Sequence, residues 1–361
     1  MIMDVIEFLC AWFYTSLNSA IAIMLVLIIR KLLGKRLWSD GRMILWLLVV
    51  IVMTVPAYPN FTYGLMVDSY LFPPFNIRFN QVGKLDGKFI IPTGNVEAVL
   101  KIWNGSGWNM YIGDGKIIGL VIFSIWITGF LFFIIWQLIV YLKLKSKLKK
   151  IEPSHDASLL SFMKSEQLYW GIRRDISIII APQKLLKEIK CPSVVGVKNP
   201  TVLIPLEQWH NLSESEKKAV ITHELMHVKH NDNLKNFFLL LIQAAHWFNP
   251  LVWIALKRLR QDIEASRDSE IVRNLDNTNI QSYASAILNI ARMNSKKYSV
   301  RPHSGMLCTS GVGLRINLIS AKNRKSIFIG IVLTILSGIL LFIVFYKWKL
   351  DIVGTYITII H

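Results

Sequence analysis

Two histidines four residues apart give this sequence its clearest chemical signal. Residues 223–227 read His-Glu-Leu-Met-His. On an α-helix, residues four apart project from one face, so His223 and His227 can offer two imidazole nitrogens to one metal ion. Glu224 would then point beside the ion, where its carboxylate suits a general base for a water molecule. The pattern predicts a hydrolytic zinc site, with a chance match on an ordinary helix as the alternative.

A catalytic zinc site also needs a third protein ligand and an open coordination position. Glu264 and Asp268 lie four residues apart on a helix predicted downstream of the motif, so they share a face. Glu264 can bind the metal while Asp268 hydrogen-bonds a histidine ligand. The alternative for this segment is a solvated charged helix face. His230 competes as third ligand, but it lies about 10 Å along the helix axis from His223, so one straight helix cannot present all three histidines.

A small sheet and a capped helix are predicted to position the motif. Ser213 and Glu216 form an S-x-x-E capping box, which predicts that the helix of the motif begins there and continues through at least Lys229. Before it, short β-rich runs punctuated by prolines predict strands at 176–180, 193–197 and 201–206.

The segment after the motif is predicted to be mostly helical. Residues 237–247 are very apolar and are expected to lie in or against a bilayer. Pro250 is a favoured first-turn residue and predicts a second helix that continues towards Val272. A later helix is expected over 280–293, followed by an irregular loop with proline and glycine over 294–313.

The composition is that of a membrane protein. Hydrophobic residues make up 53% of the 361 residues, charged residues 18%, and the mean hydropathy is +0.43. The apolar residues are clustered into stretches near the length of about 20 residues that a spanning helix needs. Four transmembrane helices are therefore predicted, at 5–29, 43–55, 117–142 and 326–346.

The distribution of basic residues predicts the topology. The net charge is +18, with basic clusters at 30–42, 143–150 and 322–325. The positive-inside rule places these clusters in the cytoplasm, and we interpret them as topology signals rather than nucleic-acid contacts. The predicted parts are transmembrane helices 1 and 2 (1–56), an extracytoplasmic loop with short strands such as 88–91 (57–116), transmembrane helix 3 (117–142), a cytosolic domain (143–325), transmembrane helix 4 (326–346) and a short extracytoplasmic tail (347–361).

The three cysteines predict no disulfide framework. Cys10 falls in a predicted span, whereas Cys191 and Cys308 fall on the predicted cytosolic side. Thiols stay reduced in that compartment.

Several segments in order resemble one known family. They are the motif with its continuation to Asp232 (HELMHVKHND), residues 246–253 (HWFNPLVW) and residues 262–268 (DIEASRD). Residues 192–196 and 200–205 also look like that family's pattern before the catalytic helix. Together these segments resemble the BlaR/MecR-type antirepressor membrane metallopeptidases, and the resemblance extends over the cytosolic domain and the four spans.

The resemblance implies a gluzincin-like α+β fold with a resident Zn²⁺. The family's third ligand is a glutamate on a later helix, which favours Glu264 over His230. Asp232 joins Asp268 as a predicted hydrogen-bond partner of the ligands. The family further implies a cytosolic catalytic domain that cleaves a DNA-binding repressor, and in some members its own chain, after a signal outside. Self-cleavage would then be sought at 294–313.

Two departures from the family limit what is transferred. Family sensors carry a large penicillin-binding domain after the last span, whereas here a short tail follows, so direct β-lactam sensing is not expected. Arg267 stands where the family often has cysteine, and His230 where it often has another basic residue. Neither departure changes a proposed ligand, so the predicted catalysis stands.

The sequence therefore predicts an α-helical membrane protein of the bacterial plasma membrane, with its N-terminus outside and a cytosolic zinc endopeptidase domain. Its expected partners are the lipid bilayer and a cytosolic protein substrate such as a winged-helix repressor, without direct contact to nucleic acid. A homodimer is left open as its assembly. Two alternatives also stay open, a general quality-control protease and a non-catalytic signalling scaffold.

Overall fold

The computed structural model describes residues 2–33, 39–54, 84–85, 88–89, 97–101, 109–182, 189, 191–297 and 312–320. The chain divides into two compact units. The first comprises Met1–Ala22, Val49–Phe132 and Ile339–His361, and the second comprises Ile23–Leu48 and Phe133–Gly338. The candidate chemistry of the sequence lies entirely in the second unit.

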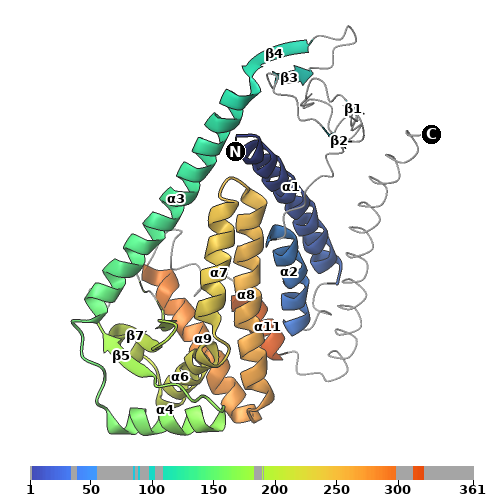
Figure 1. Cartoon of the computed structure of the whole chain (residues 1–361). Helices are drawn as coiled ribbons and strands as arrows, with labels where there is room; N and C mark the ends of the chain where they lie inside the picture. Colours follow the sequence, from blue (N-terminus) through green and yellow to red (C-terminus); the bar gives the residue numbers. More distant parts are fainter. Residues whose placement is uncertain are drawn as a thin grey trace. The chain divides into compact units, whose positions relative to one another are not determined.

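Three helices coincide with the first three predicted spans. They are α1 (Ile2–Leu33), α2 (Ser39–Thr54) and α3 (Gly115–Leu148) (Figure 1). By length and composition, Thr15–Leu32 and Gly119–Leu148 are apolar enough to cross a membrane, and the apolar part of α2, Gly41–Thr54, is shorter. That these helices cross a membrane stays a prediction. The fourth predicted span, 326–346, lies outside the described residues.

The first unit contains an aromatic cluster and two short hairpins. The ring of Trp126 on α3 lies 5.8 Å from that of Phe8 and 6.0 Å from that of Trp12, both on α1. The antiparallel pairs are β1 (Lys84–Leu85) with β2 (Lys88–Phe89), and β3 (Glu97–Lys101) with β4 (Asn109–Asp114). The strand predicted at 88–91 is thus present over its first two residues.

The small sheet of the second unit has the three predicted strands. They are β5 (Ser177–Ala181), β6 (Ser193–Val195) and β7 (Thr201–Pro205). The order is β5-β7-β6, with β5 parallel and β6 antiparallel to β7. Central strand β7 is the most apolar and the most buried, whereas β6 pairs only with β7 among the described residues. The chain leaves β6 through Gly196 at φ 95°, where a Cβ atom would lie 2.6 Å from the carbonyl oxygen of Asn199, so only glycine fits there.

Seven helices are described around and beyond this sheet. They are α4 (Ala157–Tyr169), α5 (Leu206–Trp209), α6 (Glu214–Lys229), α7 (Asp232–Ala245), α8 (Pro250–Arg273), α9 (Asn277–Lys297) and α11 (Val312–Ser320).

Helix α6 carries the histidine motif and is buried on two sides. Ile221 and Leu225 belong to a core with residues of α4 and the sheet, which includes Val202 and Ile204. Met226 belongs to a second core that α8, α9 and α11 complete. Because both sides of α6 are anchored in apolar cores, the polar residues between them are held in fixed directions.

The predicted capping box at the start of α6 is confirmed. The backbone N–H of Ser213 donates to Glu216 Oε2 at 2.9 Å, and the N–H of Glu216 donates to Ser213 Oγ at 3.4 Å. Glu216 also accepts hydrogen bonds from Ser285 and Asn289 of α9, at 2.9 and 2.6 Å. Burial alone would raise the pKa of Glu216, but these hydrogen bonds hold it below its ordinary value. One carboxylate therefore caps α6 and fixes α9 against it.

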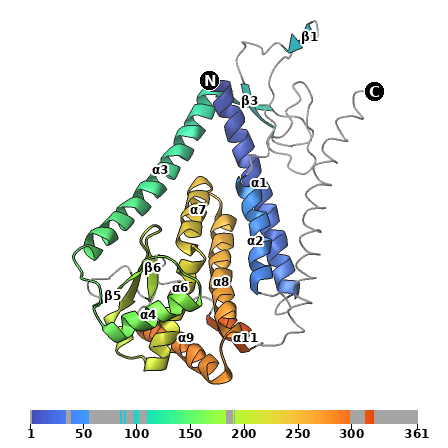
Figure 2. The same cartoon turned by 60° about the horizontal axis from the view of Figure 1, so that its bottom comes forward.

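A sharp break separates α6 from α7. Asn231 adopts the left-handed conformation at φ 55°, which ends one helix and lets Asp232 begin the next. Helices α7 and α8 then lie side by side (Figures 1 and 2). The predicted start of α8 at Pro250 is confirmed, with Asn249 Oδ1 accepting from the N–H of Leu251 at 3.0 Å. On α7, Phe237 and Phe238 are more than half exposed; that this segment lies in or against a bilayer stays a prediction.

Three sequence-based expectations need correction. Helix α9 continues to Lys297 and α11 begins at Val312, so the predicted loop at 294–313 is wrong at both ends; residues 298–311 lie outside the described residues. Helix α4 was not predicted at all, although Asp156 caps its first turn. Cys191 is disulfide-bonded, so the expectation that the cysteines on the predicted cytosolic side stay reduced is wrong for it.

Asp262 attaches α8 to α1 and α2 within the second unit. Its side chain is fully buried, and it accepts from Arg30 Nη2 at 3.0 Å and from Trp46 Nε1 at 2.8 Å. Arg30 Nη1 forms a second contact with the same carboxylate, and the guanidinium lies 5.4 Å from the centre of the Trp46 ring. Arg30 belongs to a basic cluster that the sequence explains by topology alone, but here it neutralises a buried carboxylate.

Removing Asp262 should therefore destabilise the fold strongly. Asp262→Ala leaves Arg30 without its counter-charge, and breaking a buried ion pair from one side costs about 3–5 kcal/mol. We expect the free energy of unfolding to fall by that amount in a chemical denaturation of the detergent-solubilised chain, followed by tryptophan fluorescence. Asp175→Ala, at an exposed aspartate, is the matched control. Equal midpoints for the two variants would contradict this account of the ion pair.

Candidate metal centre

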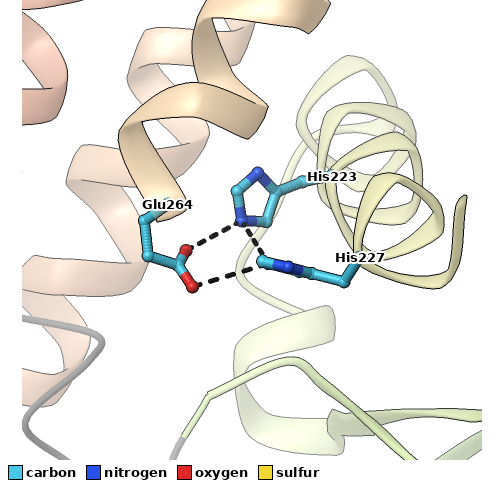
Figure 3. A group of neighbouring side chains, drawn as sticks. All are labelled: His223, His227 and Glu264. Atoms are coloured by element: carbon cyan, nitrogen blue, oxygen red, sulfur yellow. Dashed lines mark hydrogen bonds and ion pairs between the residues drawn. The ribbon is translucent and has the colours of Figure 1, made fainter. Parts of the chain in front are cut away.

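Three predicted ligands face one another between α6 and α8. Figure 3 shows His223 and His227 on one helix and Glu264 on the facing helix, with the three side chains directed toward a common point. His223 Nε2 lies 3.3 Å from His227 Nε2 and 3.2 Å from Glu264 Oε2. His227 Nε2 lies 3.5 Å from Glu264 Oε1. One ligand atom from each residue can be chosen so that all lie within 4.8 Å of one another.

The other ring nitrogen of each histidine faces an aspartate. His227 Nδ1 lies 2.8 Å from Asp232 Oδ2, and His223 Nδ1 lies 3.2 Å from Asp268 Oδ1. Tyr283 of α9 joins the second pair, because its hydroxyl lies 2.8 Å from His223 Nδ1 and donates to Asp268 Oδ1 at 2.6 Å. An ionised carboxylate only accepts hydrogen bonds, so each Nδ1 carries the hydrogen and each Nε2 bears a lone pair.

In this arrangement, three electron-pair donors face one another with no hydrogen atom placed between them. Two Nε2 lone pairs and the carboxylate of Glu264 converge inside the protein, and such a cluster is stable only around a cation or a proton. Donors bound tetrahedrally at zinc distances lie about 3.3–3.4 Å apart. The separations of 3.2, 3.3 and 3.5 Å match that spacing. The donor set of His223, His227 and Glu264 therefore fits a zinc ion.

The same crowding shifts the pKa values of the donors. Burial alone would lower the pKa of His227, but the charge of Glu264 and the hydrogen bond to Asp232 raise it well above its ordinary value. For His223, hydrogen bonds to Asp268 and Glu264 likewise outweigh burial and raise the pKa. Burial alone would raise the pKa of Glu264, but the charge of His227 and the hydrogen bond to His223 hold it well below its ordinary value. The site therefore favours positive charge at its centre.

Glu224 lies buried beside the donors, one residue after His223. It is 5% exposed. Burial raises the pKa of its carboxyl group, and the charges of His227 and His223 offset only part of that increase. A carboxyl group whose pKa is moved toward neutrality can both accept and return a proton, as a general base requires.

His230, the competing third ligand, is directed elsewhere. Its Nε2 lies 2.6 Å from Glu270 Oε2, and the same carboxylate accepts from Lys229 Nζ at 2.8 Å. His230 is not among the residues whose donor atoms cluster in the described part of the chain. The geometry thus groups Glu264, rather than His230, with the two motif histidines.

Two arginines near the donors were not identified from the sequence. Arg267 lies one turn past Glu264 on α8 and donates to both oxygens of Asp232, at 2.8 and 3.1 Å. Arg315 of α11 donates to both oxygens of Asp268, at 2.6 and 2.8 Å. Arg267 lies on the same predicted helix as Glu264, and this proximity could have identified it from the sequence. Nothing in the sequence around Arg315 indicates a role at the site, because α11 is short and follows the segment predicted to be an irregular loop.

The comparison with protein families agrees with these observations. Residues 10–319 match the family described as BlaR1 peptidase M56. The chain belongs to this family. The BlaR1 peptidase M56 match includes α6, α8 and α11 as far as Ile319, so every residue of the candidate centre falls within it.

Two individual members of the BlaR1 peptidase M56 family align with part of this chain. The chain is 31% identical to Regulatory protein BlaR1 of Bacillus licheniformis over 190 residues, or 52% of this chain and 30% of that protein. It is 21% identical to the Methicillin resistance mecR1 protein of Staphylococcus aureus over 281 residues, or 78% of this chain and 46% of that protein. The matched region thus spans less than half the length of either relative.

Zinc affinity should fall as the pH falls, and the fall should begin above the ordinary histidine pKa. An imidazole binds a metal only when neutral, so protons compete with zinc at His223 and His227. The pKa values of both are raised, so competition begins above about pH 6.5. Below both pKa values, two bound protons per site would weaken binding by about 100-fold per pH unit. Chelator competition from about pH 8.5 to about pH 5.5 measures this; a constant affinity would contradict it.

Proposed function

We propose that the protein is a membrane-bound zinc endopeptidase that cleaves a cytosolic protein. The single observation that carries this proposal is the convergence of His223 Nε2, His227 Nε2 and the Glu264 carboxylate at tetrahedral spacing, with Glu224 beside them. Family membership supports peptidase chemistry. The finer assignment to zinc and to these residues rests on the donor geometry.

The protein side chains divide the reaction between them. A zinc ion held by His223, His227 and Glu264 would polarise the peptide carbonyl and lower the pKa of a water molecule toward neutrality. Glu224 would take the proton as the water oxygen attacks the carbonyl carbon. It would then deliver that proton to the amide nitrogen as the C–N bond breaks, which leaves a free carboxyl end and a free amine. Tyr283 and Asp268 would hold the ring of His223 in place throughout.

The sheet supplies a place for the substrate backbone. A small pocket is lined by Val194 and Gly196, at the end of strand β6, and by His227. The carbonyl oxygen of Gly196 is held by Asn233 Nδ2 at 2.8 Å, which fixes the end of that strand relative to the start of α7. An extended peptide that adds to β6 as a further strand would pass beside the donors. An unfolded or exposed segment of the substrate is therefore required.

A regulatory role is the next step of the proposal. One relative is named a regulatory protein and another a methicillin resistance protein. We propose by analogy a signal received outside, cleavage of a transcriptional repressor of winged-helix type inside, and cleavage of the chain itself as a further reaction. The segment proposed for self-cleavage, 294–313, lies largely outside the described residues. A chain that stays intact under activating conditions while the repressor is cut would remove self-cleavage from this scheme.

The topology and assembly belong to the same proposal. The N-terminus would face outward and 143–325 would lie in the cytoplasm, with the bilayer as a permanent partner and a homodimer as one assembly.

The alternative functions differ in what they cleave. A quality-control protease would cut many unfolded chains, whereas a regulatory one would cut a single repressor. A scaffold would cut none.

Metal content and proteolysis together test the proposed site. We expect purified wild type to hold about one zinc ion per chain, as three protein ligands and an open position imply. Glu264→Ala should lose the metal. Glu224→Ala should keep the metal and lose proteolysis of a model repressor by at least about 100-fold, the lower end of general-base contributions.

His230→Ala is the matched control, since this histidine pairs with Glu270 instead of the donors. It should retain both zinc and activity. Zinc that remains in Glu264→Ala but leaves His230→Ala would show that the third ligand is wrong. A wild type without metal would favour the scaffold.

A further inference from the structure

The two candidate ligands on α6 are supported in matching ways. Each histidine presents Nε2 to the centre and Nδ1 to an aspartate. Each aspartate in turn is held by an arginine that donates through Nε and Nη2 to both carboxylate oxygens. The two His–Asp–Arg arms are His227–Asp232–Arg267 and His223–Asp268–Arg315. The first comes from α6, α7 and α8, and the second from α6, α8 and α11.

The side chain of Arg267 is buried, so it is not an ordinary surface charge. Its side chain is 3% exposed and that of Asp232 is 2% exposed. A third partner of Asp232 is Lys235, whose side chain is 43% exposed and whose Nζ lies 3.0 Å from the same carboxylate. The buried face of Asp232 is therefore occupied by His227 and Arg267, and the solvent face by a lysine.

Arg315 repeats this arrangement on the second arm and extends it. Besides its two hydrogen bonds to Asp268, its Nη2 lies 3.5 Å from His223 Nε2 and its Nη1 lies 3.7 Å from Glu264 Oε2. This guanidinium therefore borders the donors themselves, whereas Arg267 contacts the donors only through Asp232 among the contacts of the described residues.

A guanidinium that donates two hydrogen bonds to one carboxylate contributes more than its charge. Its planar fork fixes both the position and the plane of a carboxylate, which a lysine ammonium cannot do. A carboxylate held in one plane fixes the ring of the histidine that donates to it, and such partners of metal ligands typically affect metal affinity by about 10- to 100-fold. The lone pair of each Nε2 is thereby aimed at one point.

We propose that Arg267 and Arg315 are positioning residues for the metal centre, each of which aligns one histidine ligand by clamping the aspartate behind it. The proposal rests on the zinc site proposed above. It gives a role to Arg267, one of the two residues at which the sequence departs from the family pattern. The effect of Arg267 on the metal passes through Asp232, so Arg267 and Asp232 act as one unit.

Zinc affinity of Arg267 variants, measured by chelator competition on the full detergent-solubilised chain, tests this proposal. Arg267→Lys keeps the charge and loses the fork, and we expect it to bind zinc about 10-fold more weakly or worse. In an Asp232→Asn background, the same substitution should change affinity by no more than about twofold, because its route to the metal is already broken. Arg315→Lys should also weaken zinc binding, but part of its effect should persist in an Asp268→Asn background, because Arg315 also borders His223 and Glu264 directly.

Two controls separate positioning from charge and from folding. Arg258→Lys, at an exposed arginine of α8, should bind zinc as wild type does. Lys235→Gln removes a charge from the same carboxylate and should have less effect than Arg267→Lys. Cobalt substituted for zinc reports the geometry directly, so Arg267→Lys should alter the visible absorption spectrum of the cobalt form. Unfolding of the metal-free variants shows whether the fold is retained.

The outcomes are distinct. Wild-type affinity in Arg267→Lys, or an effect of Lys235→Gln as large as that of Arg267→Lys, would overturn positioning by the fork. Equal effects of Arg267→Lys with and without Asp232 would also overturn it, since the arginine would then act by another route. A wild type that binds no zinc would overturn the metal site and this proposal with it, whereas zinc in the wild type with unaffected arginine variants would overturn the proposal alone.

Discussion

Negative charge buried between α6 and α8 is the constraint that the rest of the second unit must satisfy. Glu224, Asp232 and Asp268 are buried, and the carboxylate of Glu264 lies 3.2 Å from His223 Nε2 at the candidate centre. Isolated charges of this kind are too costly to bury, so each needs a cation or a set of hydrogen-bond donors. Hydrogen bonds to His227 and Arg267 overcome the effect of burial and hold the pKa of Asp232 below its ordinary range. The charge of Arg315 and the hydrogen bond to His223 do the same for Asp268. At the centre itself the carboxylate of Glu264 has Arg315 at 3.7 Å, and a divalent metal held by Glu264 and the two histidines would complete the balance.

This charge balance explains why so many helices converge on one small site. The two arginines come from α8 and α11, the tyrosine from α9, and one aspartate from the first turn of α7. Each helix must therefore be held against α6 to within the tolerance of a hydrogen bond. The capping carboxylate of Glu216 fixes α9, and the left-handed residue Asn231 lets α7 begin beside His227. The apolar cores on the two sides of α6 supply most of the burial free energy, while these polar contacts determine direction.

The sequence was sufficient for elements with strong local signals and insufficient for those defined by distant partners. The capping box at Ser213, the proline at the start of α8 and the β-branched strands all have local physical causes, and all three predictions are confirmed. Helix α11 has nine residues and contains Gly313, so it is too short to be stable by itself and depends on its contacts with α8 and α9. Arg315 was missed for that reason. Arg267 was noticed as a departure from the family pattern, but its importance depends on Asp232, which lies 35 residues earlier in the chain.

Helix α8 shows why a charged helix can be mistaken for a solvated one. The alternative interpretation of residues 262–268 was an exposed charged face, because four of these seven residues are charged. Successive helical residues are rotated by about 100°, so Asp262 and Glu264 lie about 200° apart and point to nearly opposite sides. Asp262 contacts Arg30 and Trp46, whereas Glu264 faces the histidines of α6. The helix is therefore buried on two sides, and its charges are neutralised by different partners on each. A mutation at Asp262 would act on the attachment of α8 to α1 and α2, and one at Glu264 on the metal donors, although only one residue separates them.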